Sequence, residues 1–151
     1  MSNDRLKFRV YLPDENRYLH TTDCPVIDSS GELMWCYLNP FGHWEHYPME
    51  NAVVEQCTGL RDCKGNLIYE GDIITTAFEY ETPTEYDTCA VKWCRAYAGE
   101  MFCSVDERGE PVEFYGGIPL VESCRVIGNI HEIDTLRFML PENDEEKEQS
   151  K

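Results

Sequence analysis

The residues of this chain that could bind a metal or act as nucleophiles are eight cysteines and four histidines. In zinc knuckles two cysteines stand about two to four residues apart, but the nearest pairs here are Cys57 with Cys63 and Cys89 with Cys94. The first spacing is too wide, and the second lies in a strand pattern, where residues an odd number of positions apart point to opposite faces. An even number of cysteines also suits a disulfide framework, but the scattered spacing favours reduced, largely buried thiols. No metal site is predicted from the cysteines.

The segment HWEH places His43, Glu45 and His46 within four residues. On a helix this spacing could bind a metal from one face, but two prolines and a glycine interrupt the stretch and predict a long loop over 39–48. Solvated loop histidines are therefore expected. A metal-binding protein or enzyme that uses His43, His46 and nearby cysteines stays open as an alternative.

Other chemical signatures are missing from the sequence. No local cysteine–histidine motif indicates a nucleophile with its base, and no glycine-rich segment leads into a helix as a phosphate-binding loop does. The carboxylates are so numerous that no pair of them is informative. We therefore predict no enzyme, no catalytic residue and no cofactor.

The composition indicates a soluble, folded and strongly acidic protein. A length of 151 residues suits one domain, and 42% apolar and 12% aromatic residues exclude a wholly disordered chain. The net charge of −16 repels phosphate backbones and anionic membrane surfaces. Direct nucleic-acid binding is therefore not expected. An acidic surface could instead imitate DNA and occupy a host nucleic-acid-binding protein, which is a second alternative function.

The sequence predicts neither a signal peptide nor a membrane span. The N-terminal residues lack the apolar core of a signal peptide, and no apolar stretch approaches the roughly 20 residues of a membrane span. We expect a cytoplasmic protein with no membrane partner. Residues 1–140 are predicted to form a single β-rich domain, and the acidic residues 141–151 a disordered tail.

The elements that must position these side chains are predicted to be strands. Apolar and polar residues alternate in short runs that are separated by turn-forming residues, and no long helical periodicity occurs. Turns are predicted at 13–16 and 28–31, a turn-rich segment over 107–119, and at most a short helix near 49–54 or 132–139. The predicted strands are 6–12, 17–22, 32–38, 52–60, 72–80, 86–97, 100–106 and 123–133.

The stretch CTGLRDCKGNLIYEGDII, residues 57–74, is predicted to be structural. In DCKGN, Asp62 can accept a hydrogen bond from the backbone two residues on, and Gly65 permits a positive φ. The chain then changes direction sharply at Gly71, where Asp72 can accept a local backbone hydrogen bond. Leu67 and Tyr69 are placed together on one face of the intervening strand. Leu67, Ile73 or Ile74 are expected to be among the buried residues.

This stretch also resembles a known family. TGLRDCKGNLIYEGDII is similar to the central motifs of the YopX family of phages and prophages, LKFRVY to the opening of that family, and VIGNIHE to its close. The resemblance brackets residues 6–136. It departs at Tyr11 and Leu12, where the family often has Trp-Asp.

The resemblance implies a mainly β fold that contains a small SH3-like β-barrel with additional hairpins, encoded by a phage or an integrated prophage. It implies no activity. Among the matching residues, Tyr69 and Glu70 are the two that could face a partner. We expect a non-enzymatic accessory protein that binds another protein or associates with itself.

Overall fold

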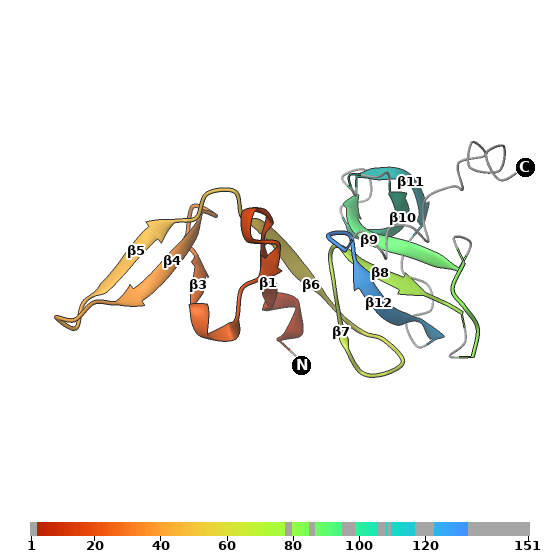
Figure 1. The fold of residues 1–151 in the computed structure, drawn as a ribbon, viewed down its shortest axis with the longest axis horizontal. Helices are drawn as coiled ribbons and strands as arrows, with labels where there is room; N and C mark the ends of the chain where they lie inside the picture. The colour runs from red at the N-terminus through yellow and green to blue at the C-terminus, as the bar shows by residue number, and fades with distance from the viewer. Residues whose placement is uncertain are drawn as a thin grey trace, which may run out of the picture. The chain divides into compact units, whose positions relative to one another are not determined.

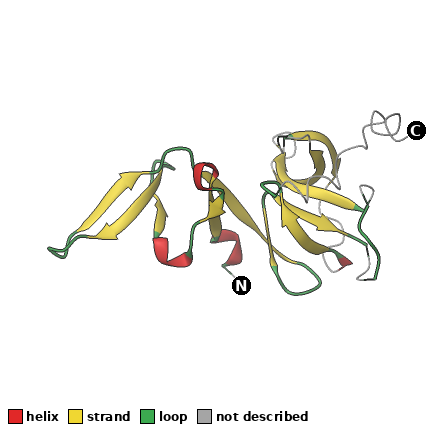
Figure 2. Ribbon diagram, viewed as in Figure 1, coloured by secondary structure: helices red, strands yellow, loops and turns green. Residues whose placement is uncertain are grey.

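A computed structural model of the chain describes residues 3–77, 80–84, 87–94, 99–105, 108, 110–116 and 123–132. The regular elements among these residues are β-strands and short 3-10 turns, without an α-helix (Figure 2). The predicted mainly β class is confirmed. The chain divides into two compact units, an N-terminal unit of Leu6–Gln56 and a C-terminal unit of Met1–Arg5 with Cys57–Lys151. A single domain with a boundary at residue 140 stays a prediction, because that boundary lies outside the described residues.

The N-terminal unit contains two antiparallel arrangements of strands (Figure 1). In the first, β1 pairs with both β2 and the beginning of β6, and in the second, β4 lies between β3 and β5. Val10, Leu12 and Leu33 are buried together, with Trp35 and Met49 packed against them. The elements of the N-terminal unit are β1 (Phe8–Leu12), η2 (Pro13–Glu15), β2 (Arg17–Tyr18), η3 (Thr21–Asp23), β3 (Pro25–Ile27), β4 (Leu33–Leu38) and β5 (Trp44–Pro48). Two elements have residues in both units, η1 (Asp4–Leu6) and β6 (Val53–Arg61).

Three predictions for this unit are wrong. The strand predicted over 17–22 is much shorter, because β2 ends at Tyr18 and η3 begins at Thr21. The loop predicted over 39–48 is a turn followed by β5, and the helix suggested near 49–54 is a bend that leads into β6. Pro48 is compatible with a strand because β5 is at the edge of its sheet, where a proline nitrogen can face outward. The other suggested helix, 132–139, lies almost wholly outside the described residues.

The C-terminal unit is built on a five-stranded antiparallel sheet in the order β11-β10-β9-β8-β12, which curls into a half-barrel (Figure 1). A further strand, β7, pairs with the second half of β6. The segment 107–119, predicted to be turn-rich, contains the strand β11. The strands are β7 (Leu67–Tyr69), β8 (Asp72–Thr75), β9 (Thr88–Cys94), β10 (Gly99–Val105), β11 (Pro111–Gly116) and β12 (Arg125–Asn129).

Strand β8 is covered on both of its faces. Ile73 packs with Ala90, Cys103 and Val105, whereas Ile74 packs in a second cluster whose other members are Ile68, Val91 and Cys124. Both isoleucines are buried, as predicted, because adjacent residues of a strand point to opposite faces and each face here has its own core. The sequence pattern did not identify Ile68, which is fully buried, while Leu67 is only half-buried.

One five-residue turn occurs three times in the described chain. In each copy the backbone N–H of the first residue donates to the carbonyl of the fifth, and the carbonyl of the first accepts the N–H of the fourth. The side-chain Oδ1 of the first residue accepts the N–H groups of the third and fifth. The fourth residue is a glycine with φ between +83° and +87°, a region that side chains disfavour. The copies are Asp28–Glu32, Asn39–His43 and Asp62–Asn66.

All eight cysteines are free thiols, as predicted. Burial raises the pKa of Cys103 to about 11 and that of Cys89 to about 12, so both are protonated at neutral pH. Cys24 and Cys63, however, are exposed and not buried. Neither lies in a strand, because Cys24 directly follows η3 and Cys63 is the second residue of the turn Asp62–Asn66.

Candidate protein-binding surface on the β4–β5 hairpin

The β4–β5 hairpin presents a different set of side chains on each of its faces. Four of the residue pairs that lie opposite each other between the two strands are, in order, Trp35–Tyr47, Cys36–His46, Tyr37–Glu45 and Leu38–Trp44. Since successive residues of a strand point to opposite sides, the first and third pairs share one face and the second and fourth share the other. We call them the tyrosine face and the tryptophan face of the hairpin.

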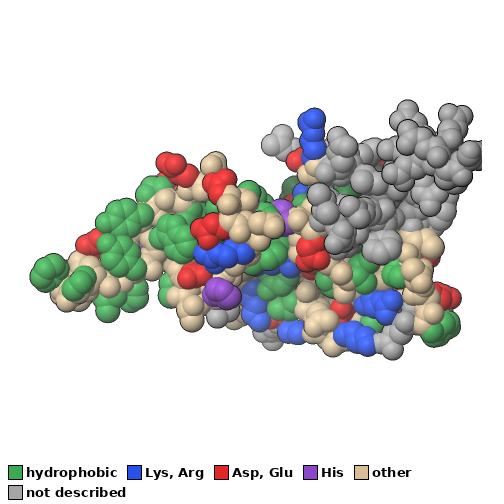
Figure 3. Space-filling view, in the orientation of Figure 1, with side chains coloured by type: hydrophobic (Ala, Val, Ile, Leu, Met, Phe, Trp, Pro, Cys, Tyr) green, Lys and Arg blue, Asp and Glu red, His purple; other side chains and the backbone are tan. Residues whose placement is uncertain are grey.

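Large apolar side chains are exposed on both faces and at the turn between the strands. Phe41 at the turn is 84% exposed, Trp44 60% and Leu38 55%. On the tyrosine face, Tyr37 and Tyr47 are 44% and 50% exposed. Figure 3 shows hydrophobic side chains gathered over the hairpin on the face that it presents. Five large apolar side chains exposed on one hairpin are more than the singly scattered ones that monomeric proteins usually show, and they make the hairpin a candidate binding surface.

The carboxylate of Glu45 holds the tyrosine face in one conformation. Its Oε2 accepts the hydroxyl protons of Tyr37 at 2.6 Å and of Tyr47 at 2.8 Å, and its Oε1 accepts Asn39 Nδ2 at 2.7 Å. The two tyrosine rings stack with centroids 5.7 Å apart and planes at 12°. These hydrogen bonds lower the pKa of Glu45 to about 2, while the bond to Glu45 raises the pKa of Tyr37. The rings are therefore ordered before any partner arrives.

The two histidines of the alternative metal site lie in different parts of the hairpin. His46 lies on the tryptophan face, where its Nε2 is 3.4 Å from Cys36 Sγ, and His43 is the last residue of the turn. Within the part of the chain that the structure describes, no three His, Cys, Asp or Glu side chains come close enough together to hold a metal ion.

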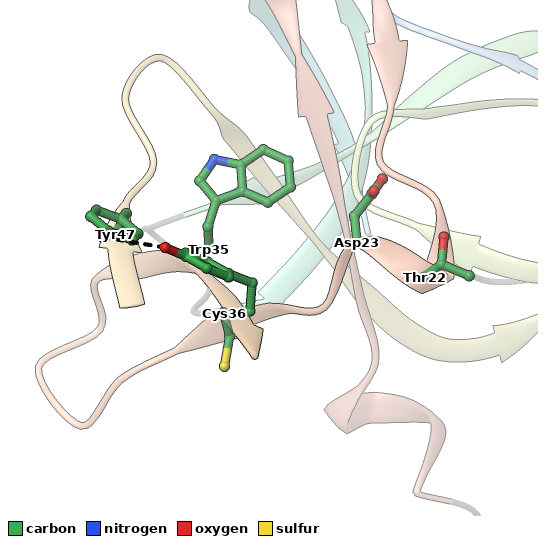
Figure 4. Close-up of a pocket in the computed structure, with 6 residues that line it drawn as sticks. Thr22, Asp23, Trp35, Cys36 and Tyr47 are labelled. Atoms are coloured by element: carbon green, nitrogen blue, oxygen red, sulfur yellow. Dashed lines mark hydrogen bonds between the residues drawn. The ribbon is translucent and has the colours of Figure 1, made fainter. Parts of the chain in front are cut away.

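A pocket of about 510 Å³ opens beside the tyrosine face (Figure 4). Its lining comes from β4 and β5, with Trp35 and the two stacked tyrosines, and from η3, with Thr22 and Asp23. Asp23 Oδ2 accepts the backbone N–H of His20 at 2.8 Å. Figure 4 shows Asp23 across the opening from Trp35. The pocket thus combines aromatic surfaces with a carboxylate.

The predicted turn residues Asp62 and Gly65 occupy the third copy of the shared turn, as expected. Asp62 is 5% exposed, and its carboxylate does more than stabilise the turn. Its Oδ2 accepts the backbone N–H of Val126 in β12 at 3.0 Å and Asn66 Nδ2 at 3.2 Å. Burial raises the pKa of Asp62, but the hydrogen bonds from Val126, Asn66 and Lys64 together lower it below the ordinary value. Asp62 therefore ties the turn to a distant strand.

The Glu70-Gly71-Asp72 step also has the predicted geometry. Gly71 has φ +86°, its N–H donates to the carbonyl of Val91 at 2.7 Å, and its carbonyl accepts the N–H of Ile130 at 2.9 Å. Asp72 Oδ2 accepts the N–H of Tyr69 at 2.7 Å. The step is therefore bonded to β9 on one side and to the residue that follows β12 on the other.

The two residues predicted to face a partner are half-buried in the C-terminal unit. Glu70 Oε1 accepts the N–H of Trp93 at 3.4 Å, and Tyr69 lies in β7. Their partner-facing role stays a prediction. The hairpin residues belong to the other unit, and sequence reasoning missed them because it interpreted 39–48 as a loop. The signal was available, since NPFGH has the same Asx-x-x-Gly spacing as the turns at 28–32 and 62–66.

Among the described residues no helix has the length and apolar character needed to cross a membrane. No curated protein matches the chain. Among solved structures, the crystal structure of protein EF1440 from Enterococcus faecalis is similar over 83% of this chain and 92% of that chain, with a TM-score of 0.50 and 21% identity. This likeness concerns the fold alone. The model of the family described as YopX protein matches residues 7–136, and the chain therefore belongs to the YopX family.

Proposed function

We propose that this protein is a non-enzymatic binding module, encoded by a phage or prophage, that captures a partner protein with the exposed hairpin of its N-terminal unit. The observation that carries the proposal is the exposure of five large apolar side chains within the eleven residues from Tyr37 to Tyr47. Aromatic residues provide most of the binding energy in protein interfaces, because they bury a large area with few rotatable bonds.

The conformation of the hairpin also supports a binding role. An aromatic side chain that is already ordered loses little conformational entropy when a partner covers it. Glu45 orders the rings of Tyr37 and Tyr47 through hydrogen bonds of 2.6 and 2.8 Å. The edge strand β5 adds backbone groups, because among the described residues β5 pairs only with β4. An extended segment of a partner could pair with that edge.

A partner other than a second copy is favoured by the charge. Two copies that each carry a net charge of −16 repel each other, so self-association would have to overcome this repulsion. A basic or neutral partner does not meet this cost.

The experiment compares three forms of the protein as immobilised bait in a lysate of its native host. The forms are the wild type, the double variant Phe41→Ser/Trp44→Ser and the control Leu6→Ser, which changes a side chain that is 78% exposed outside the hairpin. We expect at least one protein to be retained by the wild type and the control and lost with the double variant. Circular dichroism checks that all three forms are folded.

Equal retention by all three baits would refute the hairpin as the binding surface. Sedimentation velocity of the wild type provides a second test. A dimer that the double variant dissociates would support binding through the hairpin but identify the partner as a second copy.

A further inference from the structure

The hairpin lies in a segment of the chain that contains no positive side chain. Between Arg17 and Arg61 there is neither lysine nor arginine. The same segment contains six acidic residues, which are Asp23, Asp28, Glu32, Glu45, Glu50 and Glu55. Carboxylates and aromatic rings in a segment that supplies no lysine or arginine are complementary to a cationic ligand.

The pocket beside the tyrosine face concentrates this complementarity. Trp35, Tyr37 and Tyr47 supply ring surfaces, and Asp23 supplies a carboxylate at the opposite side of the opening (Figure 4). Aromatic rings attract cations through their quadrupole, with tryptophan the strongest of the three types. A planar guanidinium can stack on such a ring and also donate hydrogen bonds to a carboxylate, which an ammonium does less well.

We propose that this pocket binds an arginine side chain of the partner protein. The inference rests on the proposed function, and it adds the chemical class of the partner, a segment with an arginine close to apolar residues. The arginine would place its guanidinium between Trp35 and Asp23, while the apolar residues cover the exposed rings of the hairpin.

A cation of the chain itself stands near the pocket but does not fill it. Arg17 Nη1 is 3.8 Å from Asp23 Oδ2, whereas Arg17 Nε makes a closer contact of 2.6 Å with Glu15. Arg17 is thus shared between two carboxylates. The side chain of Asp23 remains 30% exposed, so a ligand can reach it. Arg17 also does not line the pocket.

The test uses the full chain and two short peptides. Acetyl-Gly-Arg-Gly-amide is titrated into 15N-labelled protein, and the indole N–H signals of the three tryptophans are followed. The neutral control peptide carries citrulline, which has nearly the shape of arginine without its charge. Trp44 on the tryptophan face and Trp93 in the C-terminal unit serve as internal controls.

We expect the arginine peptide to shift the Trp35 signal saturably, with a dissociation constant of about 1–10 mM, because one side chain provides only a few contacts. The citrulline peptide should produce no saturable shift. Asp23→Asn should weaken arginine binding about two- to fivefold, while Glu50→Gln, which removes an equal charge from an exposed residue outside the pocket, should leave it unchanged.

Equal binding of the two peptides, or no saturable shift at Trp35, would overturn the inference. Asp23→Asn binding as tightly as the wild type would do the same. The proposed function is tested separately, because a partner that is lost with Phe41→Ser/Trp44→Ser but kept with Asp23→Asn supports the hairpin and rejects the pocket.

Discussion

Asp62 allows a sharp test of what stabilises the C-terminal unit, because the chain contains a matched control. Asp28 has the same position in an identical turn, where its Oδ1 accepts the N–H groups of Ser30 at 2.8 Å and Glu32 at 2.9 Å. Asp28 is exposed, whereas Asp62 is buried and also bonds Val126. Alanine at each position removes the same two backbone contacts of the turn and one side-chain contact, from Ser30 Oγ to Asp28 or from Asn66 Nδ2 to Asp62. The remaining difference between the two variants is the contact of Asp62 with β12.

The expected magnitudes follow from which N–H groups lose their acceptor. In the turns the N–H groups can bond water instead, so Asp28→Ala should lower the free energy of unfolding by only about 0.5–1 kcal/mol. Asp62→Ala also leaves the half-buried N–H of Val126 without its acceptor, which adds about 1–3 kcal/mol. Asp62→Asn keeps the shape but offers one oxygen where two are used, and should cost about 1–3 kcal/mol.

The assay is urea unfolding followed by the indole NMR signal of the tryptophan in each unit. Trp93 reports on Asp62 variants, and Trp35 on the Asp28 variant. If both alanine variants lost the same stability, the long-range bond would contribute nothing and the reasoning would be refuted. A fully stable Asp62→Asn variant would refute it as well.

The same carboxylate predicts how stability depends on pH. The hydrogen bonds hold the pKa of Asp62 below its ordinary value, so the folded state binds this proton less tightly than the unfolded state does. Its contribution is therefore complete above about pH 4 and is lost as the pH falls through the lower, folded-state pKa. The stability difference between the wild type and Asp62→Asn should shrink over that range of pH.

Four further predictions concern other parts of the chain. Gly71→Ala should cost about 1 kcal/mol or more in urea unfolding, because alanine is strained at φ +86°, and an unchanged midpoint would contradict the assigned backbone conformation. Glu55→Gln should cost about 2 kcal/mol, since the carboxylate is 2% exposed and accepts Arg9 Nε at 2.5 Å, whereas Arg17→Gln, in an exposed ion pair, should change stability little. A thiol reagent should label only Cys24 and Cys63 rapidly in the native protein and all eight cysteines after denaturation without reductant, and fewer than eight would reveal disulfides. An NMR titration should find Glu45 still ionised at pH 3, because its hydrogen bonds lower its pKa to about 2. Its contribution to the hairpin is complete above its ordinary pKa and is lost as the pH falls through about 2.

Local chemistry made the turns predictable from the sequence. An Asp or Asn followed three residues later by Gly bonds its own backbone, and every contact that defines the turn lies within five residues. The position of Asp62 and Gly65 could therefore be predicted. The bond from Asp62 to Val126 joins residues 64 positions apart, and nothing in either segment indicates it. Its value for stability appears only when the fold brings β12 beside the turn.

The hairpin was not predicted because the prolines of this stretch indicated a loop, whereas its Asx-x-x-Gly spacing indicated a tight turn between two strands. Prolines usually interrupt strands, so Pro40 and Pro48 favoured a loop. Pro40, however, is the second residue of the turn, and Pro48 ends an edge strand, two places where proline is tolerated. The Asx-x-x-Gly spacing from Asn39 to Gly42 was the better guide. The exposure of the aromatic residues could not be predicted, because alternation indicates two faces but not whether either face is covered.

An exposed apolar hairpin with an open edge is a hazard to a protein, because such edges pair with one another and aggregate. The chain counters this hazard in two ways that would also select a partner. Pro48 removes one backbone donor at the end of the edge, and the net charge of −16 keeps identical copies apart. The same negative charge that repels a second copy attracts a basic surface, which is the kind of partner that we propose. An aromatic surface that served only the fold would be buried, so its exposure on the hairpin is the feature that the proposed partner would cover.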